Sequence, residues 1–225
     1  GAATCNICYL MGPPGPSATP GCTVCLCATG HRAMSSHSNA DGIPQGDNFD
    51  IDYVAHEVGH QLGANHTFSM SNEGTGVNKE VGSGITVMGY AGITGQDVAP
   101  HSIDIFHQAS IQQVSVNLAG KACPIVTDIT ANNATPVVAP VSNITIPIST
   151  PFALTGSATD ANAADVLTYC WEQNDNSTTT GNASVASPTK LTGPNWLSFL
   201  PTTNSTRLFP RLSTILTGAS ITPCF

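Results

Sequence analysis

The sequence predicts an α+β protein in which a region that contains helices is followed by an all-β sandwich-like module. Between Asn48 and Asn65 apolar residues recur at helical intervals, whereas beyond residue 140 they alternate with polar residues. Short apolar runs separated by Gly, Pro, Asn and Asp are typical of a β-sandwich, which usually has roughly 100 residues. Residues 141–225 form a segment slightly shorter than that, so we expect a module that is short or incomplete.

Four segments are expected along the chain. Residues 1–46 are rich in Cys, Pro and Gly, and runs such as Met11–Pro16 cannot continue a helix, so this segment is predicted to be irregular. Residues 47–123 hold the predicted helices. Residues 124–140 have the composition of a linker, and the β-module occupies 141–225.

The clearest predicted helix lies in the stretch between Asn48 and Asn65, and Gly63 is expected to end it, because glycine readily leaves a helix through a left-handed conformation. Residues 67–100 are rich in Gly, Ser and Asn and are predicted to be mostly loop. A second helix is predicted from Ser110, since Ser110 and Gln113 have the S-x-x-Q spacing of a capping box.

The charge content argues against two classes of partner. Charged residues make up only 9% of the 225 residues, against a usual level of about 25%. Six Lys and Arg stand against fourteen Asp and Glu, a formal charge of −8 without any basic cluster, so nucleic acid is not an expected partner. No apolar run approaches the roughly 18 residues that a membrane span needs.

The eight cysteines favour an oxidising, extracellular location, because disulfides are common in secreted chains of low charge. Five of them lie in the first 27 residues, where their spacing also suits a small zinc site of four thiolates. Disulfides, a structural zinc knuckle and unpaired thiols therefore remain open. The cysteines are Cys5, Cys8, Cys22, Cys25, Cys27, Cys123, Cys170 and Cys224.

The string HEVGHQLGANH carries the strongest chemical signal. His56 and His60 are four residues apart, so a helix presents both on one face, and Gly63 allows a turn that returns His66 as a third nitrogen ligand. Three imidazoles with one open position predict a catalytic zinc site. Glu57 is then placed to act as the general base on a water molecule. The alternative is three unrelated core or surface histidines.

The extended string H-E-x-x-H-x-x-G-x-x-H resembles the metzincin clan of zinc endopeptidases. Met88, in the sequence TVMGY, matches the methionine turn of that clan and is expected to form an apolar floor below the ligands. The sequences HEVGHQLGANHTF, VMGYAG and HSIDIFHQASIQQV, within residues 46–123, resemble reprolysin-like proteases secreted by gliding and marine bacteria. TPFALTGSATDANAADVLTYCWEQ is similar to the β-rich segment that often follows in those proteins.

Tyr90 and an acidic turn are weaker candidates. In astacin- and serralysin-like members of the clan, a Tyr two residues after the turn methionine reaches the metal or the oxyanion, and Tyr90 has this spacing. The alternative is a Tyr that only packs beside the turn. Asp160, Asn162 and Asp165 have the oxygen-rich composition of a calcium loop, and the alternative is an ordinary Asx turn.

The N-terminal part of the chain differs from the metzincin pattern that the later residues resemble. Metzincin catalytic domains place a twisted sheet and a backing helix before the zinc helix, but only 55 residues precede His56. We expect either an abbreviated upper half or a fragment. Two functions follow. The first is a secreted bacterial zinc endopeptidase that acts on protein or peptide substrates; the second is a non-catalytic extracellular structural, adhesive or filament piece derived from one. Cleavage specificity and oligomeric state are not predicted.

Overall fold

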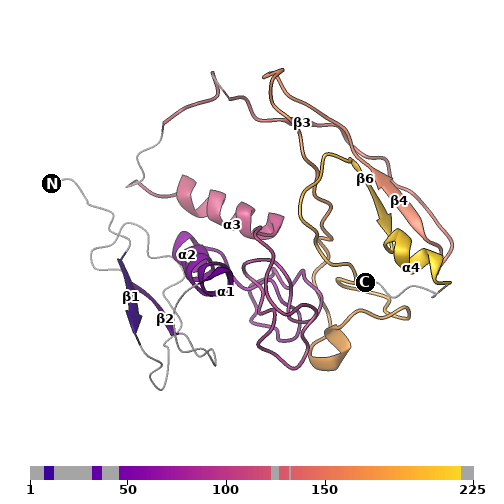
Figure 1. Ribbon diagram of the computed structural model, residues 1–225, viewed down its shortest axis with the longest axis horizontal. Helices are drawn as coiled ribbons and strands as arrows, with labels where there is room; N and C mark the ends of the chain where they lie inside the picture. The colour runs from indigo at the N-terminus through magenta and orange to yellow at the C-terminus, as the bar shows by residue number, and fades with distance from the viewer. Residues whose placement is uncertain (1–7, 13–31, 37–45, 123–126, 132, 219–225) are drawn as a thin grey trace.

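The computed structural model describes residues 8–12, 32–36, 46–122, 127–131 and 133–218. Helices α2 and α3 lie beside each other, with β1 and β2 on one side of them and the later strands on the other (Figure 1). In chain order the elements are β1 (Cys8–Gly12), β2 (Arg32–Ser36), α1 (Asp47–Phe49), the π-helical segment η1 (Asp50–Ala55), α2 (His56–Leu62), α3 (Gln108–Ala119), β3 (Val137–Val138), β4 (Phe152–Thr155), β5 (Ala158–Thr159), the 3-10 turn η2 (Gly181–Ser184), β6 (Thr206–Phe209) and α4 (Leu212–Leu216).

Within the described part of the chain, the strands form three small sheets of two strands each. β1 and β2 run parallel, whereas β3 pairs with β5 and β4 pairs with β6 in antiparallel fashion. Val137–Val138, at the end of the predicted linker, therefore belongs to a sheet. Helices together with small sheets are consistent with the α+β class. Within the described residues, no helix has the length and apolarity needed to cross a membrane.

The first predicted helix is confirmed as a continuous run of helical turns from Asp47 to Leu62, made of α1, η1 and α2. In its middle part, η1, the turns are wider, because each N–H bonds to the carbonyl five residues back. The run ends at the predicted residue, where Gly63 has a φ of 107°. This left-handed conformation is costly for residues with a Cβ.

Helix α3 is confirmed, but its predicted capping box is wrong. The helix begins at Gln108, and the Nδ1 atom of His107 accepts the N–H of Ala109 at 3.1 Å as its cap. Ser110 lies inside the helix, where its buried hydroxyl has no hydrogen-bond partner in the described structure. The side chain of Gln113 instead accepts the N–H of Asn65 at 2.9 Å. The Gln113 side chain, which the local pattern assigned to the cap, is thus used in a tertiary contact with Asn65.

The chain between α2 and α3 forms no helix or strand, as its Gly, Ser and Asn content predicts. Backbone hydrogen bonds hold it together. Val87 donates its N–H to the carbonyl of Ile105 at 3.0 Å, and Ile103 donates to Ile85 at 2.8 Å. This pairing fixes the stretch that contains the predicted methionine turn.

The predicted β-sandwich is not confirmed. β4 and β6 carry a small aromatic cluster, in which the rings of Phe152 and Phe209 stack at 4.9 Å and Trp196 meets both rings edge-on. The alternating residues Ile144, Ile146 and Ile148, which predicted a strand, lie outside any strand and are exposed. Alternation marks a strand only when another layer buries the apolar face, and the described residues supply no such layer here.

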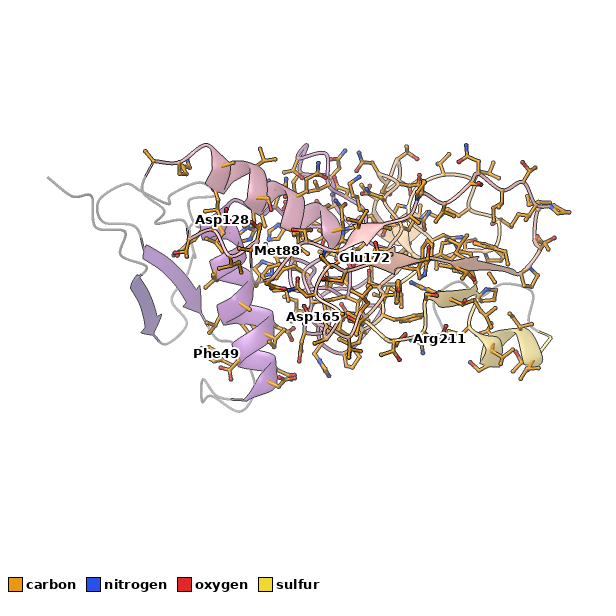
Figure 2. The ribbon with its side chains drawn as sticks, turned by 90° about the horizontal axis from the view of Figure 1, so that it is seen from above. Phe49, Met88, Asp128, Asp165, Glu172 and Arg211 are labelled. Carbon is orange, nitrogen blue, oxygen red and sulfur yellow. The ribbon has the colours of Figure 1, made fainter. Side chains whose placement is uncertain are left out.

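The segment 172–199, in the predicted β-module, packs back onto the first half of the chain. Leu197 lies in one buried apolar cluster with Val81. The Glu172 carboxylate accepts the N–H of Gln108, the first residue of α3, at 2.7 Å. Figure 2 shows Glu172 near the end of that helix. The later segment therefore supports the helices that carry the candidate site.

Candidate metal centre

Three histidine side chains converge beside α2. One ligand nitrogen from each of His56, His60 and His66 lies within 4.8 Å of the other two, and the Nε2 atoms of His60 and His66 are 3.0 Å apart. Two nitrogens bound to one zinc ion at about 2.0–2.1 Å stand roughly 3.3 Å apart in a tetrahedral site. The spacing of these atoms thus suits a single ion, as the sequence spacing predicted.

The second nitrogen of each ring is held by an oxygen atom. Nδ1 of His56 lies 2.7 Å from the carbonyl of Val87, and Nδ1 of His60 lies 2.8 Å from the carbonyl of Ala64. A carbonyl oxygen can only accept, so both Nδ1 atoms carry the proton and each Nε2 keeps its lone pair in the neutral ring. Such contacts fix the tautomer and ring orientation of metal-binding histidines.

The environment of His56 and His60 favours the neutral form of both rings. Burial, together with the neighbouring His60 and His66, lowers the pKa of His56 to about 3, against the opposing hydrogen bond to Val87. Burial also lowers the pKa of His60. A metal ion binds the neutral imidazole, so protons do not compete for these nitrogens near pH 7. The three residues therefore fit a divalent metal ion of the zinc type.

Helix α3 supports the turn that returns His66 to the site. A Cβ atom at Gly63 would lie 2.8 Å from the Cβ of Asn117, so glycine is required by close approach as well as by its backbone angle. The Asn117 amide donates to the carbonyl of Leu62 at 2.7 Å, which satisfies a free carbonyl at the end of α2. Sequence reasoning missed Asn117, because its partner lies 55 residues away.

Glu80 is a buried carboxylate that sequence reasoning also missed. It accepts hydrogen bonds from the hydroxyl groups of Thr67 and Thr86, and from the N–H groups of Ile85 at 2.9 Å and Thr86 at 3.0 Å. Thr67 directly follows His66, and Thr86 begins the methionine turn. Glu80 therefore ties the third ligand to the turn, and no local motif marks it.

Met88 packs directly against α2. Its side chain is fully buried, and a Cβ atom at Gly59 would clash with its sulfur. Gly59 immediately precedes His60, so Met88 supports the helix at the level of the ligands. Figure 2 shows Met88 close to the two helices. The methionine-turn role of Met88 stays a prediction.

Glu57 and Tyr90 lie at the same site. Burial raises the pKa of Glu57, whose carboxylate forms no hydrogen bond or ion pair with the described residues. The ring of Tyr90 lies 4.5 Å from that of His66 and 5.5 Å from that of His56, measured between centroids. Burial, with the charges of Glu73 and Glu57, raises the pKa of Tyr90 to about 12, so its hydroxyl remains a proton donor.

A family model for the M12B reprolysin-like metallopeptidases matches residues 1–117. The chain belongs to this family. The match includes all three histidines, Glu57, Met88 and Tyr90, and M12B metallopeptidases use zinc. No curated protein and no solved structure matches the chain. Membership of M12B makes this a metallopeptidase in general terms, and the described geometry supplies a matching three-histidine site.

The calcium site predicted for this M12B chain is not supported. An Oδ1 atom of Asp160 accepts the N–H of Asn162 at 2.7 Å, and Oδ1 of Asn162 accepts the N–H of Ala134 at 2.7 Å. Asp165 donates its N–H to the carbonyl of Asn162 at 2.9 Å. These are the bonds of an Asx turn. Metal ions in proteins are bound by His, Cys, Asp and Glu side chains. Among the described residues, the histidine triad is the group of such side chains that lies close enough together to hold one.

The predicted cysteine chemistry of this M12B chain falls mostly outside the described residues. Cys170 is described and carries a free thiol. The positions or side chains of the others lie outside the described part of the chain, so disulfides and the zinc knuckle stay predictions. These others are Cys5, Cys8, Cys22, Cys25, Cys27, Cys123 and Cys224.

Proposed function

We propose that this chain is a secreted bacterial zinc endopeptidase that hydrolyses peptide bonds in protein or peptide substrates. The observation that carries the proposal is the convergence of three imidazoles, with a neighbouring carboxylate that pairs with none of the described residues. His56, His60 and His66 hold the metal, and Glu57 lies next in sequence to the first of them. Zinc in such a site polarises the substrate carbonyl and makes water more acidic.

The protein groups have separate tasks in this reaction. The Glu57 carboxylate accepts the proton of the attacking water and passes it to the leaving amine; its raised pKa favours this exchange, because a general base works best when its pKa lies near the working pH. The hydroxyl of Tyr90, which stays protonated, donates to the carbonyl oxygen as negative charge develops there. Met88 keeps α2 in place below the ligands.

Cleavage of an unfolded protein substrate tests this proposal. We expect the parent to cut and a chelator to abolish the activity. Glu57→Gln should retain zinc and lose activity by a factor on the order of 10²–10⁴, because it cannot accept the proton. Asp104→Asn removes an exposed carboxylate and should leave activity unchanged.

Two results would contradict the proposal. Equal activity of Glu57→Gln and the parent would refute the role of Glu57. Zinc binding without cleavage by either protein would favour the second function, a non-catalytic extracellular piece derived from a protease.

A further inference from the structure

The three imidazoles of the metal site differ in what holds their second nitrogen. His56 and His60 face neutral backbone carbonyls, whereas Nδ1 of His66 lies 2.8 Å from a carboxylate oxygen of Glu73. A hydrogen bond to a carboxylate is roughly twice as strong as one to a neutral acceptor. His66 is therefore the ligand whose ring orientation depends on a charged group.

The loop that carries Glu73 has its own hydrogen bonds. The Asn78 amide donates to the carbonyl of Ser71 at 3.0 Å, which closes the loop on either side of Glu73. Within it, the side chain of Asn72 accepts the N–H of Gly74 at 2.9 Å, and Gly74 has a φ of 72°. These bonds restrict the backbone on both sides of Glu73. They therefore limit the positions that its carboxylate can take relative to His66.

The negative charge of Glu73 can balance part of the positive charge of the bound metal ion. A divalent ion held by three neutral imidazoles leaves two positive charges at the site. Glu57 and Glu73 both act on Tyr90, where their charges raise its pKa, so both lie near this centre. The His66 side chain is 14% exposed and that of Glu73 is 38% exposed, so solvent screens this contact less than one between fully exposed groups.

We propose that Glu73 is a positioning residue of the metal centre. It acts through His66: the carboxylate holds the Nδ1 proton, directs Nε2 at the ion and makes that nitrogen a better donor. The inference rests on the metal site of the proposed function, but not on catalysis. No sequence pattern marks Glu73, because it lies outside the H-E-x-x-H-x-x-G-x-x-H string.

Zinc affinity, measured by competition with a chelator, tests the role without any substrate. Glu73→Gln keeps an acceptor for the ring but removes the charge, whereas Glu73→Ala removes both. Loss of an outer partner of a metal-binding histidine costs about 10–100-fold in metal affinity. We expect the zinc Kd to rise about tenfold in Glu73→Gln and roughly 100-fold in Glu73→Ala. Asp104→Asn makes the same charge change at an exposed position and should bind zinc like the parent.

Two further measurements separate positioning from a structural role. The unfolding temperature of the metal-free protein should be the same for the parent and both Glu73 variants, because a partly exposed pair adds little stability. The visible absorption bands of the cobalt-substituted protein should shift in the Glu73 variants and not in Asp104→Asn, because the bands report the donor strength of the ligands.

The outcomes distinguish a failure of the metal site from a failure of the role proposed for Glu73. A parent that binds no zinc would overturn the metal site, the proposed function and this inference together. A parent that binds zinc, with both Glu73 variants within twofold of its Kd and with unchanged cobalt bands, would overturn this inference alone. If Glu73→Ala unfolds without metal, the isosteric Glu73→Gln decides the matter.

Discussion

Gly59 and Met88 are in direct contact across the floor of the metal site. A Cβ atom at Gly59 would clash with the Met88 sulfur and lie 2.9 Å from a ring carbon of Phe106. Glycine is usually unfavourable inside a helix, so its presence in α2 has a packing reason. The close approach of the two segments leaves no room for a side chain between them.

Gly59→Ala should therefore destabilise the protein although alanine favours helices. The helix gains about 1 kcal/mol from the substitution. Overpacking against a buried side chain costs about 1–3 kcal/mol. We expect a net loss of about 1 kcal/mol in the free energy of unfolding, measured with denaturant, and weaker zinc binding. Gly95→Ala is the control, because nothing lies within 4 Å of a Cβ atom there. A Gly59→Ala protein more stable than the parent would show that the contact is not tight.

Glu80→Ala should be more damaging than the loss of an exposed carboxylate with similar bonds. Glu80 accepts four hydrogen bonds in a buried position, and its removal leaves donors of Thr67 and Thr86 unpaired. Each unpaired buried group costs about 1–3 kcal/mol, so we expect a loss of about 3 kcal/mol or more in the free energy of unfolding. Asp97 accepts the N–H and hydroxyl of Thr94 at the surface, and Asp97→Ala should cost less than about 1 kcal/mol. Equal losses would contradict the structural role of Glu80.

Leu197→Ala should destabilise the region of the metal centre, although Leu197 lies far along the chain. Its side chain is 5% exposed and packs with Val81. Truncating a buried leucine costs about 2–5 kcal/mol. Leu191→Ala, at a position 84% exposed, should cost little. We expect the chain to unfold in a single transition with denaturant. In Leu197→Ala the midpoint of this transition should lie at a lower denaturant concentration. Two transitions, with only the later one shifted, would show instead that the β-rich segment folds by itself.

The Cys170 thiol should react slowly near neutral pH. Burial, together with the nearby charge of Glu172, raises its pKa from 9.0 to about 11. Only the thiolate attacks an alkylating reagent, so a higher pKa leaves less of the reactive form at pH 8. We expect iodoacetamide to label Cys170 roughly 100-fold more slowly than an ordinary cysteine at pH 8, with the rate rising about tenfold per pH unit up to pH 10. Peptide mass spectrometry measures the rate at this residue. Rapid labelling at pH 8, or a disulfide at Cys170, would contradict the structure.

The residues of the metal centre that belong to one continuous motif could be predicted from the sequence. The spacing of His56, His60 and His66, and the glycine turn between the last two, follow from helix geometry. Glu73 and Glu80 could not be predicted in this way, because their roles depend on how a loop without helices or strands folds back on itself. Nothing in the local pattern distinguishes a buried acid from a surface one.

The helices were easier to predict than the strands for a related reason. Periodicity located α2, and the S-x-x-Q spacing located α3. That spacing placed the cap of α3 at Ser110, because it could not show that Asn65 takes the Gln113 side chain. In the second half, alternation at Ile144–Ile148 predicted a strand, although no described layer covers it. Strand formation depends on partners that are distant in sequence.

X-ray absorption at the zinc edge, combined with metal analysis of the purified protein, tests the central claim most directly. We expect one zinc ion per chain with nitrogen and oxygen neighbours at about 2.0–2.1 Å, including the outer scattering of imidazole rings. Sulfur neighbours at about 2.3 Å around a single zinc ion would place the metal on the cysteines instead. That result, or the absence of zinc from a folded protein, would contradict a zinc site at His56, His60 and His66.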